Sequence, residues 1–407
     1  MFKKILKDEL IRGSLTLFVM IGVFNFLNYL QHFFMARMLG PEEYGLFAVL
    51  MAVTFIFTVP SEAIQTFVSR LISKFNQKKE FKKMKFVFSR TLNKGMKLAL
   101  ICFVMFVPIA IFLSYFLPHT TFFHLIFTGV IIFGVFSVPV IRGVLQGRKK
   151  FKKLGWSMIV ESVFKLIISI LLVSLGLKTY GAMAGVILGL FFSFLISLAF
   201  IKEVVIQKKS EIRIKSIQSS AIIVTMLIIA VMLSLDIILA KRLFSDELAG
   251  KYAVVSMLGK MIFFGVQPIS KAMFPIASED ADKGRKKNKT FYKSMILITI
   301  LCLISVTIFF IFPRLLIKVF FGQQYIEVSN LVGIVGLALS FLAIANLVLL
   351  YHLSLSRIKK PLLLIVFPIL QCIFLLFFHR TIVQFSLALL FSDLIVLVFS
   401  LSILSKR

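Results

Sequence analysis

The stretch ARMLGPEEYGLFAV, from Ala36 to Val49, returns 205 positions later as KRLFSDELAGKYAV, from Lys241 to Val254. The two copies match at several positions, which are Arg37/Arg242, Glu42/Glu247, Gly45/Gly250, Ala48/Ala253 and Val49/Val254. A match over such a distance indicates that the chain consists of two related halves. The rest of the sequence has to show what each half contains.

Each copy has the features of a connection that leads into a helix. Gly40-Pro41 predicts a turn, because proline is favoured in the first turn of a helix. The acidic pairs Glu42-Glu43 and Asp246-Glu247 would face the positive N-terminus of the helix that follows. Gly45 and Gly250 predict close helix packing, since a glycine lets two backbones approach. We prefer this structural interpretation to direct contact with a substrate.

The composition is that of a membrane protein. Hydrophobic residues make up 59% of the 407 residues, and the mean hydropathy is +1.01, more than a soluble domain of this length could bury. Apolar runs of about 18 to 25 residues, enough for a helix to cross about 30 Å of hydrocarbon, recur along the chain. They predict twelve transmembrane helices, at residues 13–36, 46–69, 95–117, 121–144, 156–177, 180–201, 218–241, 252–275, 293–312, 328–351, 361–378 and 381–404.

The positive charge follows the membrane topology. The chain has 47 lysines and arginines and a net charge of +30, and most of these cations lie in alternate connections between the predicted helices. Lysine and arginine are retained on the cytoplasmic side, so we expect a multi-pass protein of the cell membrane with both termini in the cytoplasm. This location makes nucleic acid an unlikely partner and makes membrane lipids the expected contact of the basic segments.

The repeat divides the predicted helices into two sets of six. An offset of 205 aligns the first helix with the seventh and the second with the eighth. Six helices are an even number, so both sets enter the membrane from the same side and should be related by an axis along the membrane normal. The sequence thus predicts an all-α protein with two parallel six-helix lobes and a central cavity. The N-lobe would span 1–202, a cytoplasmic linker 203–217 and the C-lobe 218–407.

A polar stripe runs along the first predicted helix. Asn25, Asn28 and His32 follow one another at spacings of three and four residues, which places them on one face, with Gln31 beside them. We interpret them as lining of the cavity, although amides can also serve as hydrogen-bonding contacts between helices. His32 is a candidate for proton coupling because imidazole titrates near neutral pH, with a packing role as the alternative.

Three lysines lie at membrane depth. Lys260 and Lys271 have no acidic residue one turn away, so each needs a counter-ion from another helix or from a ligand. Both are candidate substrate-binding residues, and snorkelling of Lys271 to the membrane surface is the alternative. Lys165 follows Glu161 by four residues, a spacing that favours an ion pair between the two. Such a pair could neutralise itself without touching a ligand.

Several carboxylates accompany these lysines inside the predicted spans. Glu62 follows Pro60 in the second helix, Asp236 lies in the seventh at the repeat position of Gln31, and Asp393 lies in the twelfth. Together with Glu161, they could bind H⁺ or Na⁺ during transport, or they could simply neutralise the lysines. The sequence is equally compatible with both roles.

The sequence offers no site for nucleotide hydrolysis or other catalysis. The segment GRKKFKKLG, from Gly147 to Gly155, lacks the order of a P-loop, and no paired metal ligands or nucleophile elbow are present. We therefore expect no enzyme activity, no metal and no organic cofactor. A two-lobed bundle with a cationic interior favours alternating access driven by an ion gradient or by the substrate gradient.

Three segments in order resemble a known family. They are MARMLGPEEYGLFAVL (35–50), VLQGRKKFKKLGWSMIVES (144–162) and GKYAVVSMLGK (250–260) followed by FPIAS (274–278). Together they resemble the polysaccharide-biosynthesis flippases of the multidrug, oligosaccharidyl-lipid and polysaccharide (MOP) exporter superfamily. The resemblance implies a MATE-like fold, named after that superfamily's multidrug exporters. It also implies export of polyprenyl-phosphate- or pyrophosphate-linked oligosaccharides to the outer leaflet for cell-surface polysaccharide synthesis.

A phosphate headgroup that crosses the membrane needs cations, and Lys260, Lys271, Lys165, Arg37 and Arg142 could supply them. Arg142 has an alternative role as an anchor at a helix end. Other glycan-assembly proteins would be further partners. Two other functions stay open, namely an ion-coupled antiporter of organic cations from the same superfamily and a non-transporting scaffold for glycan assembly. The first would have an acidic cavity, whereas here buried lysines roughly match the buried carboxylates.

Overall fold

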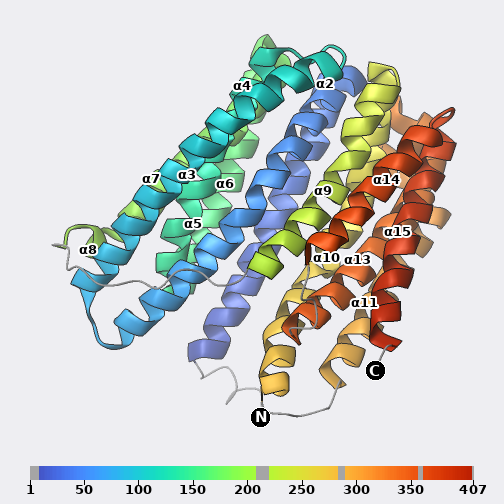
Figure 1. Cartoon of the computed structure of the whole chain (residues 1–407). Helices are drawn as coiled ribbons and strands as arrows, with labels where there is room; N and C mark the ends of the chain where they lie inside the picture. Colours follow the sequence, from blue (N-terminus) through green and yellow to red (C-terminus); the bar gives the residue numbers. More distant parts are fainter. Residues whose placement is uncertain (1–8, 208–219, 283–288, 356–360, 406–407) are drawn as a thin grey trace. The chain divides into compact units, whose positions relative to one another are not determined.

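The computed structural model describes residues 9–207, 220–282, 289–355 and 361–405, and the regular elements in these ranges are all helical (Figure 1). This confirms the predicted all-α class. The first part of the chain forms α2 (Glu9–Gln77), α3 (Phe81–Phe116), α4 (Phe122–Gly129), α5 (Ile131–Gly147), α6 (Phe151–Leu172), a π-helical turn (Val173–Leu177), α7 (Lys178–Phe200) and α8 (Lys202–Val205).

The second part begins after the 208–219 segment, which lies outside the described residues. It forms α9 (Ser220–Leu243), α10 (Asp246–Asp282), α11 (Lys289–Ile311), α12 (Pro313–Phe320), the 3₁₀ helix η2 (Gln323–Leu331), α13 (Val332–Ser354), the 3₁₀ helix η3 (Pro361–Ile365), α14 (Val366–Phe377) and α15 (Ile382–Ser405). The acidic pair Asp246-Glu247 occupies the first turn of α10, as the sequence predicted.

The described residues contain nine helical stretches long and apolar enough to span a membrane. Two of these stretches, Val19–Gln77 and Phe151–Phe200, are each interrupted by a glycine with positive φ, at Gly40 (75°) and Gly176 (87°). Counting the halves separately and adding the shorter apolar helix Pro361–Phe377 gives the twelve predicted spans. The protein is therefore a multi-pass membrane protein by the length and apolarity of its helices.

Some helices are longer than the apolar runs that predicted them. The third predicted span starts at residue 95, whereas α3 starts at Phe81. Likewise, α10 continues to Asp282, past the predicted end at 275. Lysine and glutamate are good helix formers, so a helix can continue beyond the hydrocarbon where hydropathy no longer marks it.

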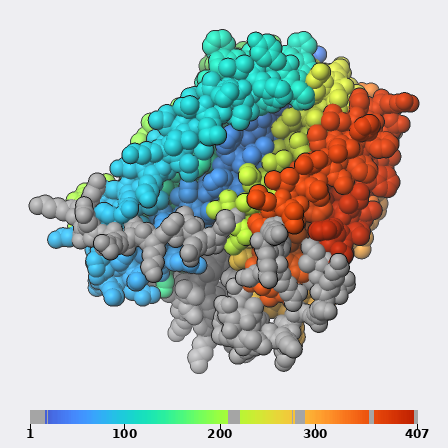
Figure 2. All heavy atoms as spheres, viewed as in Figure 1, coloured from blue at the N-terminus to red at the C-terminus, as the bar shows by residue number. Residues whose placement is uncertain are grey.

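The apolar surface of α3 is consistent with contact with lipid. This helix runs along the visible surface of the first part of the chain (Figure 2). Val104, Met105 and Phe112 on it are 60%, 65% and 63% exposed. Large apolar side chains exposed in a row would be unfavourable in water.

Contacts divide the chain into two compact units, which differ in one respect from the predicted lobes. The first unit comprises residues 1–39 and 57–218, and the second comprises residues 40–56 and 219–407. The predicted lobe boundary near 202 assigned residues 40–56 to the first half, whereas their contacts lie in the second unit. The two lobes were inferred from chain order alone, which cannot reveal that a segment packs with the other half.

The repeated stretch explains how residues 40–56 join the second unit. A Cβ atom on Gly45 would lie 2.9 Å from Cα of Gly250, and one on Gly250 would lie 1.7 Å from the carbonyl oxygen of Pro41. The two copies of the repeat therefore pack against each other through their glycines. This confirms the structural interpretation of the repeat, because only glycine allows backbones to approach so closely.

Close helix packing also positions the polar residues of the first unit. Gly181, Gly185 and Gly189 follow one another at intervals of four along α7 and face α6. A Cβ atom on Gly185 would lie 2.1 Å from Oγ of Ser169, and one on Gly189 would lie 2.8 Å from Cβ of Lys165. This glycine ridge brings α7 onto the face of α6 that carries Lys165.

Candidate functional site

The predicted site residues form two buried clusters, one in each unit. We call the first the N-cluster; it consists of Asn28, Gln31, Arg142, Glu161, Lys165 and the serines that bind them. The second, the C-cluster, consists of Asp236, Lys260 and Asp393 with Tyr252 and Ser256.

Arg142 of α5 is the centre of one half of the N-cluster. Its Nη2 atom donates to Oε2 of Glu161 at 2.7 Å and to Oγ of Ser193 at 3.2 Å, and its Nε atom donates to Oγ of Ser157 at 3.2 Å. The side chains of Arg142 and Glu161 are each 11% exposed. Arg142 thus holds α5, α6 and α7 together.

This geometry corrects the predicted ion pair between Glu161 and Lys165. Glu161 is bonded to Arg142 instead, which reaches it from another helix and offers a planar guanidinium. Lys165 donates from Nζ to Oδ1 of Asn28 at 2.8 Å. The spacing of four residues made a pair within the helix plausible, but it could not reveal a stronger partner on α5.

The other half of the N-cluster joins α2 to α6. Besides the bond from Lys165 to Asn28, the Nε2 atom of Gln31 donates to Oγ of Ser169 at 3.0 Å. Asn28 and Gln31 are three residues apart on α2, and their partners Lys165 and Ser169 are four residues apart on α6. Both pairs follow the same chain direction, as expected for two helices that run parallel. Lys165 is 7% exposed, and Asn28 accepts one of the three N–H bonds that an ammonium group can donate.

The C-cluster is built around Asp236 of α9, which is fully buried. Its Oδ1 atom accepts a hydrogen bond from Nζ of Lys260 at 3.2 Å, and its Oδ2 atom accepts one from Oγ of Ser256. Ser256 and Lys260 lie one turn apart on α10, so one face of that helix supplies both donors. Lys260 therefore finds its counter-ion on another helix, which is one of the two possibilities that its sequence context predicted.

Asp393 of α15 has a different environment. It is fully buried, and neither carboxylate oxygen has a hydrogen-bond partner among the described residues. Electrostatic interactions connect it to Asp236 and to the fully buried Tyr252. A buried carboxylate without a donor is costly, so Asp393 is stable either as the neutral acid or with a bound cation.

The remaining predicted residues are exposed or only half-buried. Arg37 and Glu62 on α2 and Lys271 on α10 are exposed side chains. Asn25 and His32 on α2 are half-buried. Of the predicted stripe of the first helix, Asn28 and Gln31 belong to the N-cluster through their hydrogen bonds to α6.

Some buried polar residues were not predicted from the sequence. In α10, Tyr252, Ser256 and Lys260 recur every four residues, a spacing that indicates one polar face. Gln371 of α14 is fully buried, and its side-chain amide has no partner among the described residues. In each case the sequence signal that could have revealed the residue is a polar side chain within an apolar run.

In chemical terms, each cluster contains a buried lysine, Lys165 or Lys260, that its polar partner engages only in part. A lysine ammonium group is a common ligand of phosphate oxygens. The C-cluster adds a carboxylate that requires a proton or a cation. The two units therefore carry groups that could bind an anion, and the second unit also carries one that could bind a cation.

The fold is that of transporters in the MOP superfamily. A structure described as a multidrug resistance MATE family transporter of this superfamily, in an inward-facing conformation, has a TM-score of 0.70 at 13% identity, over 93% of this chain and 94% of that one. The lipid II flippase MurJ, in an inward closed conformation, has a TM-score of 0.69 at 17% identity, over 97% and 88%. A MOP superfamily transporter from Pyrococcus furiosus, whose binding pocket is described as having reverse polarity, has a TM-score of 0.56 at 14% identity, over 98% and 96%.

The polysaccharide biosynthesis protein family matches residues 10–281. The chain therefore belongs to this family. No curated protein matches it. The identities to the solved structures are low, so these structures establish the fold, and the family match establishes the link to polysaccharide biosynthesis.

Proposed function

We propose that the protein is a flippase that moves a polyprenyl-phosphate- or pyrophosphate-linked oligosaccharide from the cytoplasmic to the outer leaflet by alternating access. The observation that supports this most is that each cluster contains a buried lysine, Lys165 in the N-cluster and Lys260 in the C-cluster. Each has N–H groups beyond the one that its partner accepts. The phosphate of a lipid carrier could take these remaining bonds while the polyprenyl tail stays in lipid.

The C-cluster supports coupling to H⁺ or Na⁺. Asp393 needs a proton or a cation, and Asp236 lies close enough to interact with it electrostatically. Binding of a positive ion would reduce the repulsion between the two carboxylates. Glu161, Glu62 and His32 are weaker candidates for this role, because Glu161 is already paired with Arg142 and the other two are more exposed than Asp236 and Asp393.

A second candidate function is antiport of organic cations. The fully buried Asp393 favours it, because an acidic residue without a partner can attract a cationic substrate. The likeness to a multidrug resistance transporter concerns the fold only. The lysine in each unit argues for an anionic substrate instead.

Purified protein in liposomes would distinguish the two functions. One assay measures the exchange of a lipid-linked oligosaccharide between leaflets, and the other measures the efflux of a fluorescent organic cation. We expect exchange of the glycolipid without cation efflux. Cation efflux alone would overturn the flippase proposal in favour of the antiporter.

The role of Lys260 can be tested in the same liposomes. Lys260→Met removes the ammonium group but keeps an unbranched side chain, and we expect it to lower glycolipid exchange by about 10-fold or more, the loss of one charge-assisted contact of roughly 1.5 kcal/mol or more. Lys97→Met removes an exposed cation of α3 and should leave exchange unchanged. Normal exchange by a correctly inserted Lys260→Met variant would remove this residue from the substrate site.

A further inference from the structure

One turn occurs twice at one end of the first unit. Residues 78–83 read KKEFKK between α2 and α3, and residues 148–153 read RKKFKK between α5 and α6. At the same position of each, Lys79 and Lys149 have positive φ values of 54° and 57°. The next helix then begins at a phenylalanine, Phe81 or Phe151. The two turns therefore present their lysines in the same way.

The backbone hydrogen bonds confirm that the turns have one geometry. The amide of Lys79 donates to the carbonyl of Asn76 at 3.1 Å, and that of Lys149 donates to Gln146 at 3.0 Å. The residues that follow, Glu80 and Lys150, donate to the carbonyls five positions before them. A lysine in the left-handed conformation is uncommon, and here it occurs twice in equivalent places.

Contacts join the two turns into one surface. The guanidinium group of Arg148 lies 5.4 Å from the centre of the Phe81 ring, so the second turn packs on the first. Glu203 of α8 accepts hydrogen bonds from Arg148 at 2.6 Å and from Lys150 at 3.1 Å. We call residues 78–83, 148–153 and 202–207 the basic-turn surface.

The basic-turn surface keeps a large excess of positive charge. The first turn has four cations and the second has five, against the single carboxylate of Glu80 within the turns. Hydrogen bonds from Arg148 and Lys150 lower the pKa of Glu203 to about 2, so Glu203 stays charged and offsets part of the excess. Arg148 is largely buried, and its Nε and Nη1 atoms have no acceptor among the described residues. The surface therefore has more donors than the described acceptors use.

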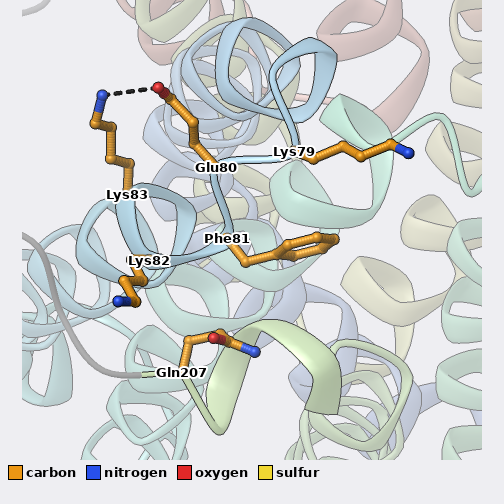
Figure 3. A pocket seen from close by; sticks show the side chains of 6 residues that line it. All are labelled: Lys79, Glu80, Phe81, Lys82, Lys83 and Gln207. Atoms are coloured by element: carbon orange, nitrogen blue, oxygen red, sulfur yellow. Dashed lines mark hydrogen bonds and ion pairs between the residues drawn. The ribbon is translucent and has the colours of Figure 1, made fainter.

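A shallow hollow lies at the first turn. Its volume is about 360 Å³, and it is lined by Lys79, Glu80, Phe81, Lys82, Lys83 and Gln207. In Figure 3, Lys79 extends to one side of the turn and Lys82 and Lys83 extend to the other. Ammonium groups that spread in this way do not enclose one small anion. Ammonium groups at such a spread are better suited to a flat surface that presents several negatively charged groups.

Exposed apolar side chains accompany the cations. Trp156 is 53% exposed and lies one helical turn after Lys152, on the same face of α6. Ile206, next to Gln207 in the hollow, is 78% exposed. Tryptophan is enriched where protein meets the membrane surface, with its ring at the level of the lipid headgroups. Cations beside such side chains are typical of a surface that contacts anionic lipid.

We propose that the basic-turn surface binds the phosphate headgroups of anionic phospholipids in the leaflet that it faces. The two turns act together because Arg148 packs on Phe81 and Glu203 links the second turn to α8. This binding is distinct from that of the transported glycolipid, because it uses exposed lysines, whereas the two clusters are buried.

The only tryptophan of the chain, Trp156, makes the proposal directly measurable. The protein is placed in vesicles of phosphatidylcholine with a fixed fraction of phosphatidylglycerol, and dibrominated acyl chains are introduced either on one lipid or on the other. Bromine quenches nearby tryptophan fluorescence. We expect phosphatidylglycerol to be enriched about five-fold or more around Trp156 relative to phosphatidylcholine, in line with the attraction of one cation near an anionic surface.

A pair of matched variants separates this surface from general positive charge. Lys82→Gln with Lys152→Gln changes one exposed lysine at the equivalent position of each turn, and it should bring the enrichment close to one. Lys94→Gln with Lys97→Gln removes the same charge from exposed positions further along α3, and it should leave the enrichment unchanged. Equal quenching by both lipids in the unaltered protein, or an equal loss in both variants, would overturn the proposal.

A further comparison in the same quenching experiment tests whether the surface binds lipid headgroups or free phosphate. Inorganic phosphate is compared with chloride at the same ionic strength. We expect both salts to weaken the lipid preference equally, because screening depends on ionic strength. If phosphate alone abolished the preference, the surface would be a site for the soluble anion, and the lipid proposal would be wrong.

Discussion

Asp236 and Asp393 lie in the same unit and are both fully buried, but their surroundings differ. Asp236 accepts hydrogen bonds from Lys260 and Ser256, whereas the oxygens of Asp393 have no such partner in the described part of the chain. The same substitution should therefore destabilise the protein much more at Asp236 than at Asp393. The comparison also tests which of them holds a proton or a cation.

We expect Asp236→Asn to lower the free energy of unfolding by about 3–5 kcal/mol, because it leaves the Lys260 ammonium group buried without a counter-ion. Asp393→Asn should cost less than about 1 kcal/mol, since it replaces a carboxyl group that has no donor by a neutral amide of the same shape. Thermal unfolding in detergent would measure both. In liposomes, Asp393→Asn should also remove the dependence of transport on H⁺ or Na⁺. A variant that unfolds early and keeps the ion dependence would contradict this role for Asp393.

At the scale of the elements, the contact between α6 and α7 determines where Lys165 and Ser169 lie. In Gly185→Ala the added methyl group would lie 2.6 Å from the backbone nitrogen of Ser169, so the helices would have to separate. Overpacking of this kind costs about 1–3 kcal/mol. Thermal unfolding should show the loss. Gly265→Ala provides the control, because a Cβ atom there meets no atom within 4 Å, and in a helix alanine should be neutral or slightly stabilising.

The contacts of α8 with the second basic turn predict a dependence on pH. The folded pKa of Glu203 is about 2, below its ordinary value of 4.5, so its bonds to Arg148 and Lys150 stabilise the fold at full strength above pH 4.5. This contribution is lost as the pH falls from 4.5 towards 2. Glu203 is half exposed, so the effect should be at most about 1 kcal/mol. The unfolding temperatures of the unaltered protein and Glu203→Gln should differ at pH 6 and converge near pH 2. A constant difference would contradict the assignment.

At the scale of the whole molecule, the grouping of residues 40–56 with the second unit predicts how fragments behave. A fragment of residues 1–202 lacks Gly250, which packs against Gly45 in the complete chain. We expect this fragment to be digested by protease within its 40–56 segment, and coexpression with residues 203–407 should protect it. Equal protection without the second fragment would show that the segment needs no partner from it.

Much of the fold followed from hydropathy, charge and the repeat, since these depend on the membrane more than on particular contacts. The twelve spans and the packing of Gly45 on Gly250 are examples. The grouping of residues 40–56 with the second unit could not be predicted, because it depends on tertiary contacts. For the same reason the sequence predicted the polar residues of the clusters better than their partners, as the pairing of Glu161 with Arg142 shows.

The backbone at Gly40 has a consequence for motion. The chain passes from the first unit into the second at this residue and returns to the first after residue 56, so Gly40 lies at one of the points where the backbone crosses between the units. With φ of 75° and ψ of 175°, Gly40 occupies a region that is almost closed to other residues. Glycine has no Cβ atom and can adopt φ values of either sign. The backbone can therefore rotate at this position within a helix that is otherwise stiff.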